Sequence, residues 1–477
     1  MRMKIDEQIV SRVVKEVLAR LEKQSTAVAS GQTGFGVYDR MEDAVGAAQA
    51  SFQKLRDAGI EARKKALGVI RRMSEDKAKE WGALELDETK IGRLDHKIEK
   101  LGICGRLVPG VEFLERMAFS GDFGLTIIDF APWGVIGAVT PSTHSVPTLT
   151  GNAINMIAAG NSVVYNTHPS ACNCAAVAIH AYNQEIYRET GISDLMTTVR
   201  KPTLDTFNAM CADPRVGLLC VTGGPGVVKA AMKTGKRAIC AGPGNPPVVV
   251  DETADLDRAA RSIIQGSAYD NNLLCIGEKE VFVVAPVADA LIAALKRAGA
   301  MQLTGAQVEA LTKAAFTFPE GQGAGCPHAQ LNKKLVGQGP KFLGRQIGID
   351  VPDQCDLLFG ETDEKHPFVQ EEQMMAFLPI VRVKDVDAGI EAAIRAEHGY
   401  KHTAIMHSTH VGRLTKMAQA VDTTLFIKNG PCMTGLGLGG EGFLSFSIAT
   451  PTGEGVTTPM TFTRSRRCVM VESLNLF

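Results

Sequence analysis

The chain opens with apolar residues at helical spacing. Within the first 21 residues they gather on one face, with mostly polar and charged residues opposite: Ile5, Ile9, Val10, Val13, Val14, Val17, Leu18 and Leu21. Residues 22–37 are rich in small and polar types, which predicts a flexible linker. A tethered helix cannot bury its stripe within itself. It is therefore expected to fold back on the body, to pair in an oligomer, or to dock onto another protein.

Beyond residue 38 a long helical pattern gives way to short β-prone apolar runs that alternate with helical stretches. These runs cover residues 133–140, 161–167, 216–223, 246–251 and 280–286. Strands separated by helices predict parallel sheets of the α/β class. Two successive sets predict two domains, 38–247 and 248–442, and residues 443–477 are expected to return to the first. The β-prone segment near 120–131 and the β-like C-terminal run are expected to form an arm.

Composition excludes several classes of protein. Of 477 residues, 45% are hydrophobic and 22% charged, and the net charge of −1 gives no basic surface for nucleic acid or anionic membrane. No apolar run spans a bilayer, and no signal-peptide pattern is found. The eleven cysteines lack regular spacing, which indicates reduced thiols. The lone C-x-C pair at Cys172 and Cys174 predicts no metal site.

Two turns could contact a ligand. The glycine-rich turn in "VTGGPGVVKAAM" lies between a strand and a helix, where backbone N–H groups can bind a pyrophosphate. Its spacing is not G-x-G-x-x-G, so a plain tight turn explains it equally well. His168, Pro169 and Ser170 follow the strand at 161–167, where ligands meet open α/β sheets. The alternative is a solvated loop histidine.

Cys275, in "YDNNLLCIGEKEVFVV", is a candidate nucleophile. A reactive thiolate requires a lowered pKa or a neighbouring base. Most other cysteines, such as Cys104, Cys220 and Cys240, lie in apolar runs and are expected in the core. The sequence around Cys275 does not by itself decide between a nucleophile and a core thiol.

Taken in order, five motifs resemble the aldehyde dehydrogenase superfamily from about residue 38 to the end of the chain. They are "PWGVIGAVTPSTHSVPT", "AAGNSVVYNTHPSA", "VTGGPGVVKAAM", "NNLLC" and "EEQMMAFLPI". The segments "GAVTPST", "AGPGNPP" and "TPTGEGVTTPMTFTRSRRCV" resemble the CoA-acylating members of bacterial microcompartments. The resemblance implies two Rossmann-like parallel-sheet domains and a β oligomerisation arm.

The resemblance also implies roles for the catalytic residues. Cys275 would attack the aldehyde to give a thiohemiacetal, whose oxyanion its own backbone N–H and a side chain from "PSTH" would hold. Ordinary members have an asparagine there, whereas this chain has Thr143 at the matching position and His144 beside it. His402 matches a histidine of the CoA-acylating branch and either relays a proton or has a structural role.

The implied cofactor is NAD. Its pyrophosphate would meet the glycine-rich turn, and Glu372 would contact the nicotinamide ribose. His168 stands where hydrolytic members have a lysine, and Ala171 replaces the acidic residue that follows, so NADP stays possible. The full set implied for cofactor binding is His168, Pro169, Ser170, Thr222, Gly223, Gly224, Gly226, Val227 and Glu372.

One absence favours CoA as the acyl acceptor. Hydrolytic members activate water with a glutamate in "E-L-G-G-K", whereas the aligned segment here is "C-A-G-P-G", with Cys240 in its place. Without that base the acyl-enzyme should persist until a thiol takes the acyl group.

The sequence therefore predicts oxidation of a short aliphatic aldehyde, propionaldehyde above others, with NAD and CoA to acyl-CoA and NADH. Acetaldehyde oxidation in ethanolamine use, hydrolysis to the free acid, a silent scaffold and an acyl-phosphate reductase are the alternatives. The resemblance favours docking of residues 1–21 onto shell proteins, inside a microcompartment of the bacterial cytoplasm. It also implies a homo-oligomer, a dimer or a tetramer.

Overall fold

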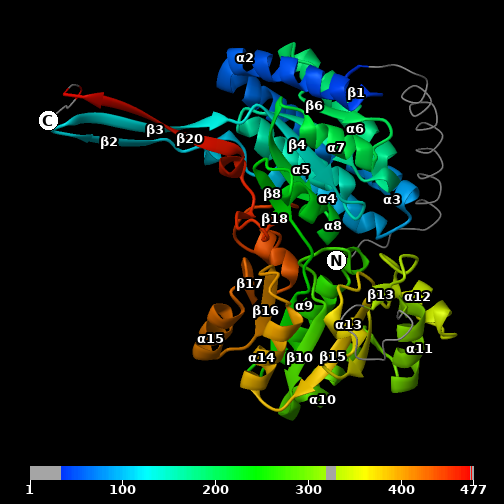
Figure 1. Cartoon of the computed structure of the whole chain (residues 1–477). Coiled ribbons are helices and arrows are strands. Elements are labelled where there is room, and N and C mark those ends of the chain that lie inside the picture. Colours follow the sequence, from blue (N-terminus) through cyan, green and yellow to red (C-terminus); the bar gives the residue numbers. More distant parts are fainter. Residues whose placement is uncertain (1–33, 318–328, 473, 475–477) are drawn as a thin grey trace. The chain divides into compact units, whose positions relative to one another are not determined.

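The computed structural model describes residues 34–317, 329–472 and 474, and Figure 1 labels their helices and strands. The predicted docking helix, residues 1–21, and most of the predicted linker lie outside the described residues. Residues 34–37, the end of that linker, are instead part of the fold. Val37 is 1% exposed within strand β1, and the Gly36 N–H donates to Asp194 at 2.6 Å. The linker prediction was wrong there because small residues also suit a buried edge strand.

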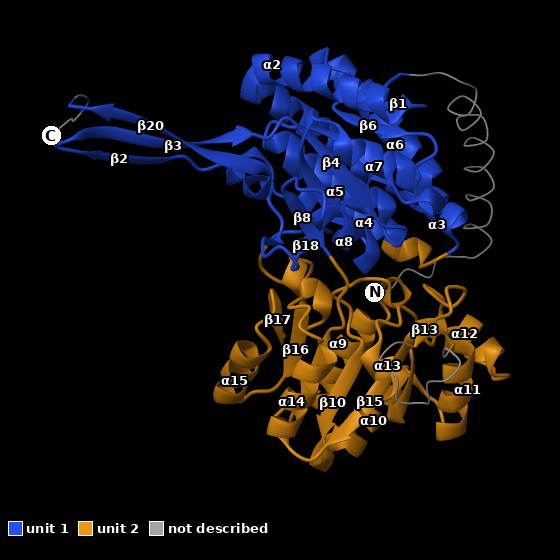
Figure 2. Cartoon of the chain, in the orientation of Figure 1, with its two compact units in different colours: residues 1–90, 97–241, 443–477 blue, residues 91–96, 242–442 orange. Residues whose placement is uncertain are grey.

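The described chain divides into two compact units (Figure 2). Unit 1 contains residues 34–90, 97–241 and those from 443 onward, and unit 2 contains residues 91–96 and 242–442. The chain thus enters unit 2 at Gly242, where the sequence pattern suggested residue 248. The inclusion of residues 91–96 in unit 2 was not anticipated, because a six-residue excursion leaves no mark on hydrophobic periodicity.

The sheet of unit 1 has the strand order β1-β6-β5-β4-β7-β8, and every pair is parallel. Its strands are β1 (Val37–Tyr38), β4 (Val135–Thr140), β5 (Ser162–Thr167), β6 (Met196–Val199), β7 (Val216–Thr222) and β8 (Ala238–Ala241). Its helices are α2 (Met41–Asp76), α3 (Ala78–Thr89), α4 (Leu94–Leu107), α5 (Ser145–Ala158), α6 (Cys172–Thr190), α7 (Leu204–Ala212) and α8 (Pro225–Met232). β4 and β5 are buried along their whole length, as expected for a parallel sheet covered on both faces.

Unit 1 also carries the predicted arm. Strands β2 (Met117–Gly121), β3 (Gly124–Pro132) and β20 (Thr463–Val471) form an antiparallel sheet that extends away from the helices of unit 1 (Figure 1). β20 pairs with β3 of its own chain along nine residues. Phe119 and Phe123 are 60% and 90% exposed, so the arm presents apolar surface. The prediction of an arm from the segment near 120–131 and the C-terminal run is confirmed.

Unit 2 has a second parallel sheet, in the order β11-β14-β15-β10-β9-β16-β17. Its strands are β9 (Pro247–Val250), β10 (Glu280–Val284), β11 (Met301–Gln302), β14 (Leu358–Thr362), β15 (Phe377–Val383), β16 (Thr403–His407) and β17 (Leu425–Lys428). Its helices are α9 (Leu256–Ser267), α10 (Ala285–Arg297), α11 (Gly305–Ala315), α12 (Pro340–Gln346), α13 (Pro367–Gln370), α14 (Val386–Ala396) and α15 (Val411–Val421). Two parallel sheets confirm the predicted α/β class.

Short elements complete the chain. They are the paired strands β12 (Phe316–Thr317) and β13 (Gln330–Leu331), the paired strands β18 (Ile448–Ala449) and β19 (Gly455–Val456), and the 3₁₀ turns η1 (Val111–Phe113), η2 (Pro169–Ala171), η3 (Tyr269–Asn272), η4 (Cys432–Leu436) and η5 (Pro459–Phe462). No helix in the described part of the chain combines the length and the apolar character needed to cross a membrane.

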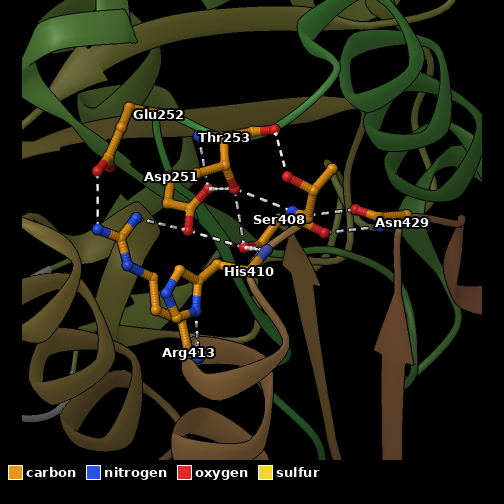
Figure 3. A network of polar contacts seen from close by, with 8 residues as sticks. Asp251, Glu252, Thr253, Ser408, His410, Arg413 and Asn429 are labelled. Carbon is orange, nitrogen blue, oxygen red and sulfur yellow. Dashed lines mark hydrogen bonds and ion pairs between the residues drawn. The ribbon is translucent and has the colours of Figure 1, made fainter.

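A polar network closes the carboxyl edge of the unit 2 sheet (Figure 3). The buried Asp251, directly after β9, accepts hydrogen bonds from the Thr253 and Ser408 hydroxyls at 2.6 and 2.8 Å and from Arg413 at 3.0 Å. Ser408 follows β16, and its N–H donates to Asn429, which follows β17. These side chains bind one another, so this edge has a structural role.

The network predicts a cost for losing its central carboxylate. Asp251→Ala leaves Arg413 and two hydroxyls without their acceptor, and we expect it to lower the free energy of unfolding by about 3 kcal/mol. Urea denaturation measures this value. Asp257→Ala removes one side of the exposed pair with Arg297 and serves as the control, with an unchanged midpoint expected. Equal midpoints for the two variants would contradict the structural role of Asp251.

Candidate active site

Four segments that carry candidate chemistry meet at the amino edge of the unit 2 sheet. Gly244 lies before β9, Cys275 before β10, Glu372 before β15 and His402 before β16. Because β9, β10, β15 and β16 are parallel and adjacent, their amino ends share one edge. Residues up to 158 positions apart in the sequence, from Gly244 to His402, are thereby brought together.

Cys275 is the one residue between Asn271 and Glu280 that is not buried. Burial of the sulfur raises the pKa of the thiol to about 12, the charge of Glu372 adds to this, and the charge of Lys279 opposes it. The resting residue is thus a protonated thiol that needs a proton acceptor or added positive charge to react.

His402 is a fully buried neutral imidazole. Burial lowers its pKa to about 4, and the charge of Lys279 acts in the same direction. The backbone N–H of His402 donates to Glu397 at 2.8 Å, and Nδ1 of the ring lies 2.9 Å from the Thr403 hydroxyl. Nε2 has no hydrogen-bond partner among the described residues. At neutral pH the ring is therefore uncharged, and Nε2 is open to a hydrogen bond from a bound group.

Gly244 is the point at which the candidate residues meet. A side chain added there would place Cβ 2.5 Å from the Cys275 carbonyl oxygen and 2.9 Å from Cγ of His402. The backbone of Gly244 also acts on the Glu372 carboxylate, where it opposes the rise in pKa that burial causes. The main chain of Gly244 therefore lies against Cys275 and His402 and near Glu372, and only glycine permits this approach.

In unit 1 the predicted cofactor residues follow the neighbouring strands β5, β4 and β7, so they also share one edge, the carboxyl edge. Thr143 and His144 come after β4, with the Thr143 hydroxyl 2.9 Å from His144 Nδ1. His144 is 5% exposed and its ring lies 5.5 Å from that of Phe446. The two candidates for the second oxyanion donor thus form one hydrogen-bonded pair.

The glycine-rich turn suits a pyrophosphate in part. Thr222 Oγ1 bonds Ser447 at 2.7 Å, and the Gly223 N–H donates to Ala241 at 3.1 Å, so these two groups hold the fold. A Cβ added at Gly224 or Gly226 would meet nothing within 4 Å. Gly224 caps α8, whose first-turn N–H groups lack partners inside the helix. Gly224, Gly226 and Val227 could hold an anion there.

The strand β5 ends in an exposed turn made of His168, Pro169 and Ser170. The Ser170 N–H donates to His168 Nδ1 at 3.2 Å, and the Ser170 hydroxyl lies 2.8 Å from the same nitrogen. His168 therefore caps the short turn η2, and its exposed position is compatible with a role toward an adenosine ribose.

Cys240, in the place of the hydrolytic glutamate, is a core residue. Its side chain is fully buried within the apolar core of unit 1, and burial raises the pKa of its thiol to about 11. The backbone N–H of Cys240 donates to the Thr452 hydroxyl at 3.0 Å. No acid or base side chain stands at this position.

Two further features of the described residues concern metal binding and cavities. No group of three or more His, Cys, Asp or Glu residues in residues 34–317 and 329–472 could hold a metal ion. A cavity of about 580 Å³ in unit 2 is lined by none of the predicted site residues. Its walls are Lys296, Gly299, Ala300, Met301, Gln302, Leu303, Thr304, Pro352, Gln354 and Cys355.

Sequence reasoning missed Gly244 and Lys279. Gly244 was visible only as part of a glycine/proline turn, since close approach leaves no mark in sequence. Lys279 did leave a signal: three consecutive charged residues, 278–280, directly precede a β-prone apolar run. All three are fully buried.

The close approach at Gly244 predicts a specific loss. Gly244→Ala should lower kcat/KM more than tenfold, because a methyl group 2.5 Å from a backbone oxygen must displace the Cys275 segment. Steady-state assays and a thermal melt measure activity and folding. Gly305→Ala, in open space on α11, is the control. A Gly244→Ala enzyme as active as this control would contradict the arrangement.

Comparisons with known proteins show the family of this chain. The model of the aldehyde dehydrogenase family matches residues 16–314. Acetaldehyde dehydrogenase (acetylating) EutE of Salmonella typhimurium is 45% identical over 473 residues, which covers 99% of this chain and 100% of that protein.

Two solved structures are similar along most of the chain. Rhodopseudomonas palustris propionaldehyde dehydrogenase, with bound CoA and an acylated cysteine, has a TM-score of 0.89 and 44% identity and covers 93% of this chain and 100% of its own. A propionaldehyde dehydrogenase from the Clostridium phytofermentans fucose utilisation bacterial microcompartment has a TM-score of 0.89 and 41% identity with the same coverage. This chain belongs to the aldehyde dehydrogenase family.

Proposed function

We propose that the protein is a CoA-acylating aldehyde dehydrogenase that converts propionaldehyde, NAD and CoA into propionyl-CoA and NADH. The observation that carries this proposal is the convergence of a partly exposed Cys275, Glu372 and the buried imidazole of His402 on Gly244. The buried thiol of Cys240, where hydrolytic members have a glutamate, supports transfer to CoA over hydrolysis. The similar enzymes with acetylating and propionaldehyde-oxidising names support the same reaction class.

In the first half-reaction Cys275 gives up its proton and its sulfur bonds the carbonyl carbon of the aldehyde. His402 Nε2 is proposed as the proton acceptor. The carbonyl oxygen becomes an oxyanion, which the Cys275 N–H and the Thr143–His144 pair are proposed to stabilise. NAD, when bound, would accept the hydride that leaves this carbon. A thioester on Cys275 results.

In the second half-reaction the CoA thiolate attacks the thioester carbonyl, the bond to Cys275 breaks, and the cysteine thiolate leaves. Transfer between thiols needs no strong base in the site. We propose that Gly224, Gly226 and Val227 hold the pyrophosphate, that His168 and Ser170 contact the adenosine ribose, that Glu372 contacts the nicotinamide ribose, and that CoA enters where NADH has left. Ala171 stands where an acidic residue would bind the free 2′-hydroxyl of the adenosine ribose in NAD. NADP is therefore to be tested beside NAD.

A second candidate substrate is acetaldehyde, which the 45% identity to the acetylating relative favours. NADH formation from acetaldehyde, propionaldehyde and butyraldehyde, with and without CoA, separates the possibilities. We expect the highest kcat/KM with propionaldehyde, continuous turnover only with CoA, and no NADH from Cys275→Ala. Free acid released without CoA at the rate seen with CoA would instead establish a hydrolytic enzyme.

We also propose that residues 1–21, outside the described residues, dock onto shell proteins of a microcompartment, as the microcompartment source of a similar enzyme supports. The exposed apolar arm is proposed to join subunits into a dimer or a tetramer.

Deleting residues 1–21 tests the docking proposal. We expect kcat and KM to stay within twofold of the full chain, because residues 1–21 include none of the proposed site residues. We expect the truncated enzyme to be lost from purified shells. Retention of the truncated enzyme in shells would contradict docking through this segment.

A further inference from the structure

A fully buried lysine lies four residues after the nucleophile. Lys279 precedes β10, and its side chain is 0% exposed. Its Nζ donates to three oxygens of the segment before Cys275: the Asn272 carbonyl at 2.8 Å, the Leu274 carbonyl at 3.2 Å and Oδ1 of Asn272. No ion pair between Lys279 and a carboxylate is found within the described part of the chain. The interaction is therefore made almost wholly with the nucleophile's own segment.

The hydrogen bonds define the charge of this group. The three partners of Nζ are carbonyl-type oxygens, which only accept hydrogen bonds. Three acceptors match the three N–H bonds of an ammonium, whereas a neutral amine has two N–H bonds and a lone pair that would face these oxygens. We therefore assign Lys279 as an ammonium: burial lowers its pKa, and the charges of Glu372, Cys275, Cys432 and Glu280 oppose this effect.

The segment it holds has an unusual backbone. Asp270, Asn271 and Asn272 have φ values of 50°, 55° and 64°, so three consecutive residues adopt the left-handed conformation. Asp and Asn tolerate this region better than other non-glycine residues, but each still carries a cost. The turn persists only where surrounding contacts impose it.

Those contacts come chiefly from the two ends of the turn. Asn272 Nδ2 donates to the Ser267 carbonyl at 3.0 Å and to the Glu278 carbonyl at 2.8 Å. The Lys279 ammonium donates to the backbone carbonyl of Asn272. Asn271 Nδ2 donates to the Gly337 carbonyl at 2.8 Å. Removing Lys279 would leave the buried Asn272 carbonyl without a donor, and the Leu274 carbonyl would keep only the Gly277 N–H, at the turn that sets the position of Cys275.

Lys279 also ties this turn to the other catalytic segments. Its N–H donates to Pro246, beside Gly244, at 3.0 Å, and its carbonyl accepts from the Gln373 side chain, beside Glu372, at 3.0 Å. The charges of four titratable groups raise the pKa of Lys279: Glu372, Cys275, Cys432 and Glu280. The charge of Lys279 in turn lowers the pKa of Glu278 and of His402. Two charged side chains shift the pKa of the Cys275 thiol: Glu372 raises it and Lys279 lowers it.

We infer that Lys279 is the positioning residue of the nucleophile: its ammonium fixes the left-handed turn before Cys275 and supplies the positive charge that favours the thiolate. This inference rests on the proposed function, because it takes Cys275 as the nucleophile. The ammonium also favours Cys275 as a leaving group, since the thiolate re-forms when the acyl group departs.

Alkylation of Cys275 tests this inference without aldehyde or CoA, so a failed dehydrogenase assay would not affect the result. Iodoacetamide, which is neutral, reports the thiolate fraction. Iodoacetate, which is anionic, responds in addition to local positive charge. The rates are measured by mass spectrometry of the peptide containing Cys275, with Cys275→Ala as the blank, at pH 7–10 on the full chain.

Lys279→Met should lower the iodoacetamide rate about tenfold at each pH, as a rise of about one unit in the thiol pKa requires, and should lower the iodoacetate-to-iodoacetamide ratio as well. Asn271→Ala, the matched control, loosens the same turn but keeps all three oxygens bound to Nζ, so its ratio should equal that of the wild type. Lys279→Arg keeps the charge and should restore the ratio.

Two results would overturn the inference. One is a Lys279→Met enzyme with the wild-type rate ratio, which would leave Lys279 a purely structural role. The other is a Lys279→Arg enzyme whose ratio falls as far as that expected for the neutral variant. The result with Lys279→Arg tests the role of the positive charge even if Lys279→Met does not fold.

Discussion

The parallel pairing of β9, β10, β15 and β16 is the constraint on which the site depends. Parallel strands have their amino ends at one edge, so the four segments that precede these strands must meet there. The strands themselves are apolar and buried on both faces, and their cores fix the register. Reversing any one strand would carry its preceding segment, and the residue it bears, to the far edge of the sheet.

The two edges of this sheet have different uses. Ligands of open α/β sheets usually lie at the carboxyl edge, and in unit 1 the residues proposed for the cofactor do so. In unit 2 the carboxyl edge is closed by Asp251, Ser408 and Arg413, and Cys275, the proposed nucleophile, lies at the amino edge. The proposed function therefore assigns cofactor binding to a carboxyl edge and covalent chemistry to an amino edge.

The amino edge carries a concentration of buried charge. Glu278, Lys279 and Glu280 follow one another without exposure to solvent, and burial raises the pKa of Glu278 to about 7. Burying ionisable groups is costly unless other groups compensate, and Lys279 is compensated by three oxygens of the nucleophile's segment. If Cys275 is the nucleophile proposed above, its reactivity and the stability of this edge depend on the same hydrogen bonds.

Sequence reasoning predicted the features that follow from regular hydrophobic patterns or from family motifs. Alternating strands and helices predicted two parallel sheets, and the family resemblance selected Cys275, Glu372 and His402, which the structure brings to one edge of the unit 2 sheet. It could not find Gly244, because a close approach between a glycine and two distant segments has no local pattern. It also treated the last residues before β1 as linker, since burial of Val37 depends on pairing with β6, which lies far along the chain.

The central claim is that Cys275 carries an acyl group that awaits CoA. Mass spectrometry of the protein after reaction with propionaldehyde and NAD, without CoA, tests it most directly. We predict a stable mass increase of one propionyl group on the peptide containing Cys275, which addition of CoA removes while propionyl-CoA forms. An unmodified Cys275 together with free propionate would contradict the account.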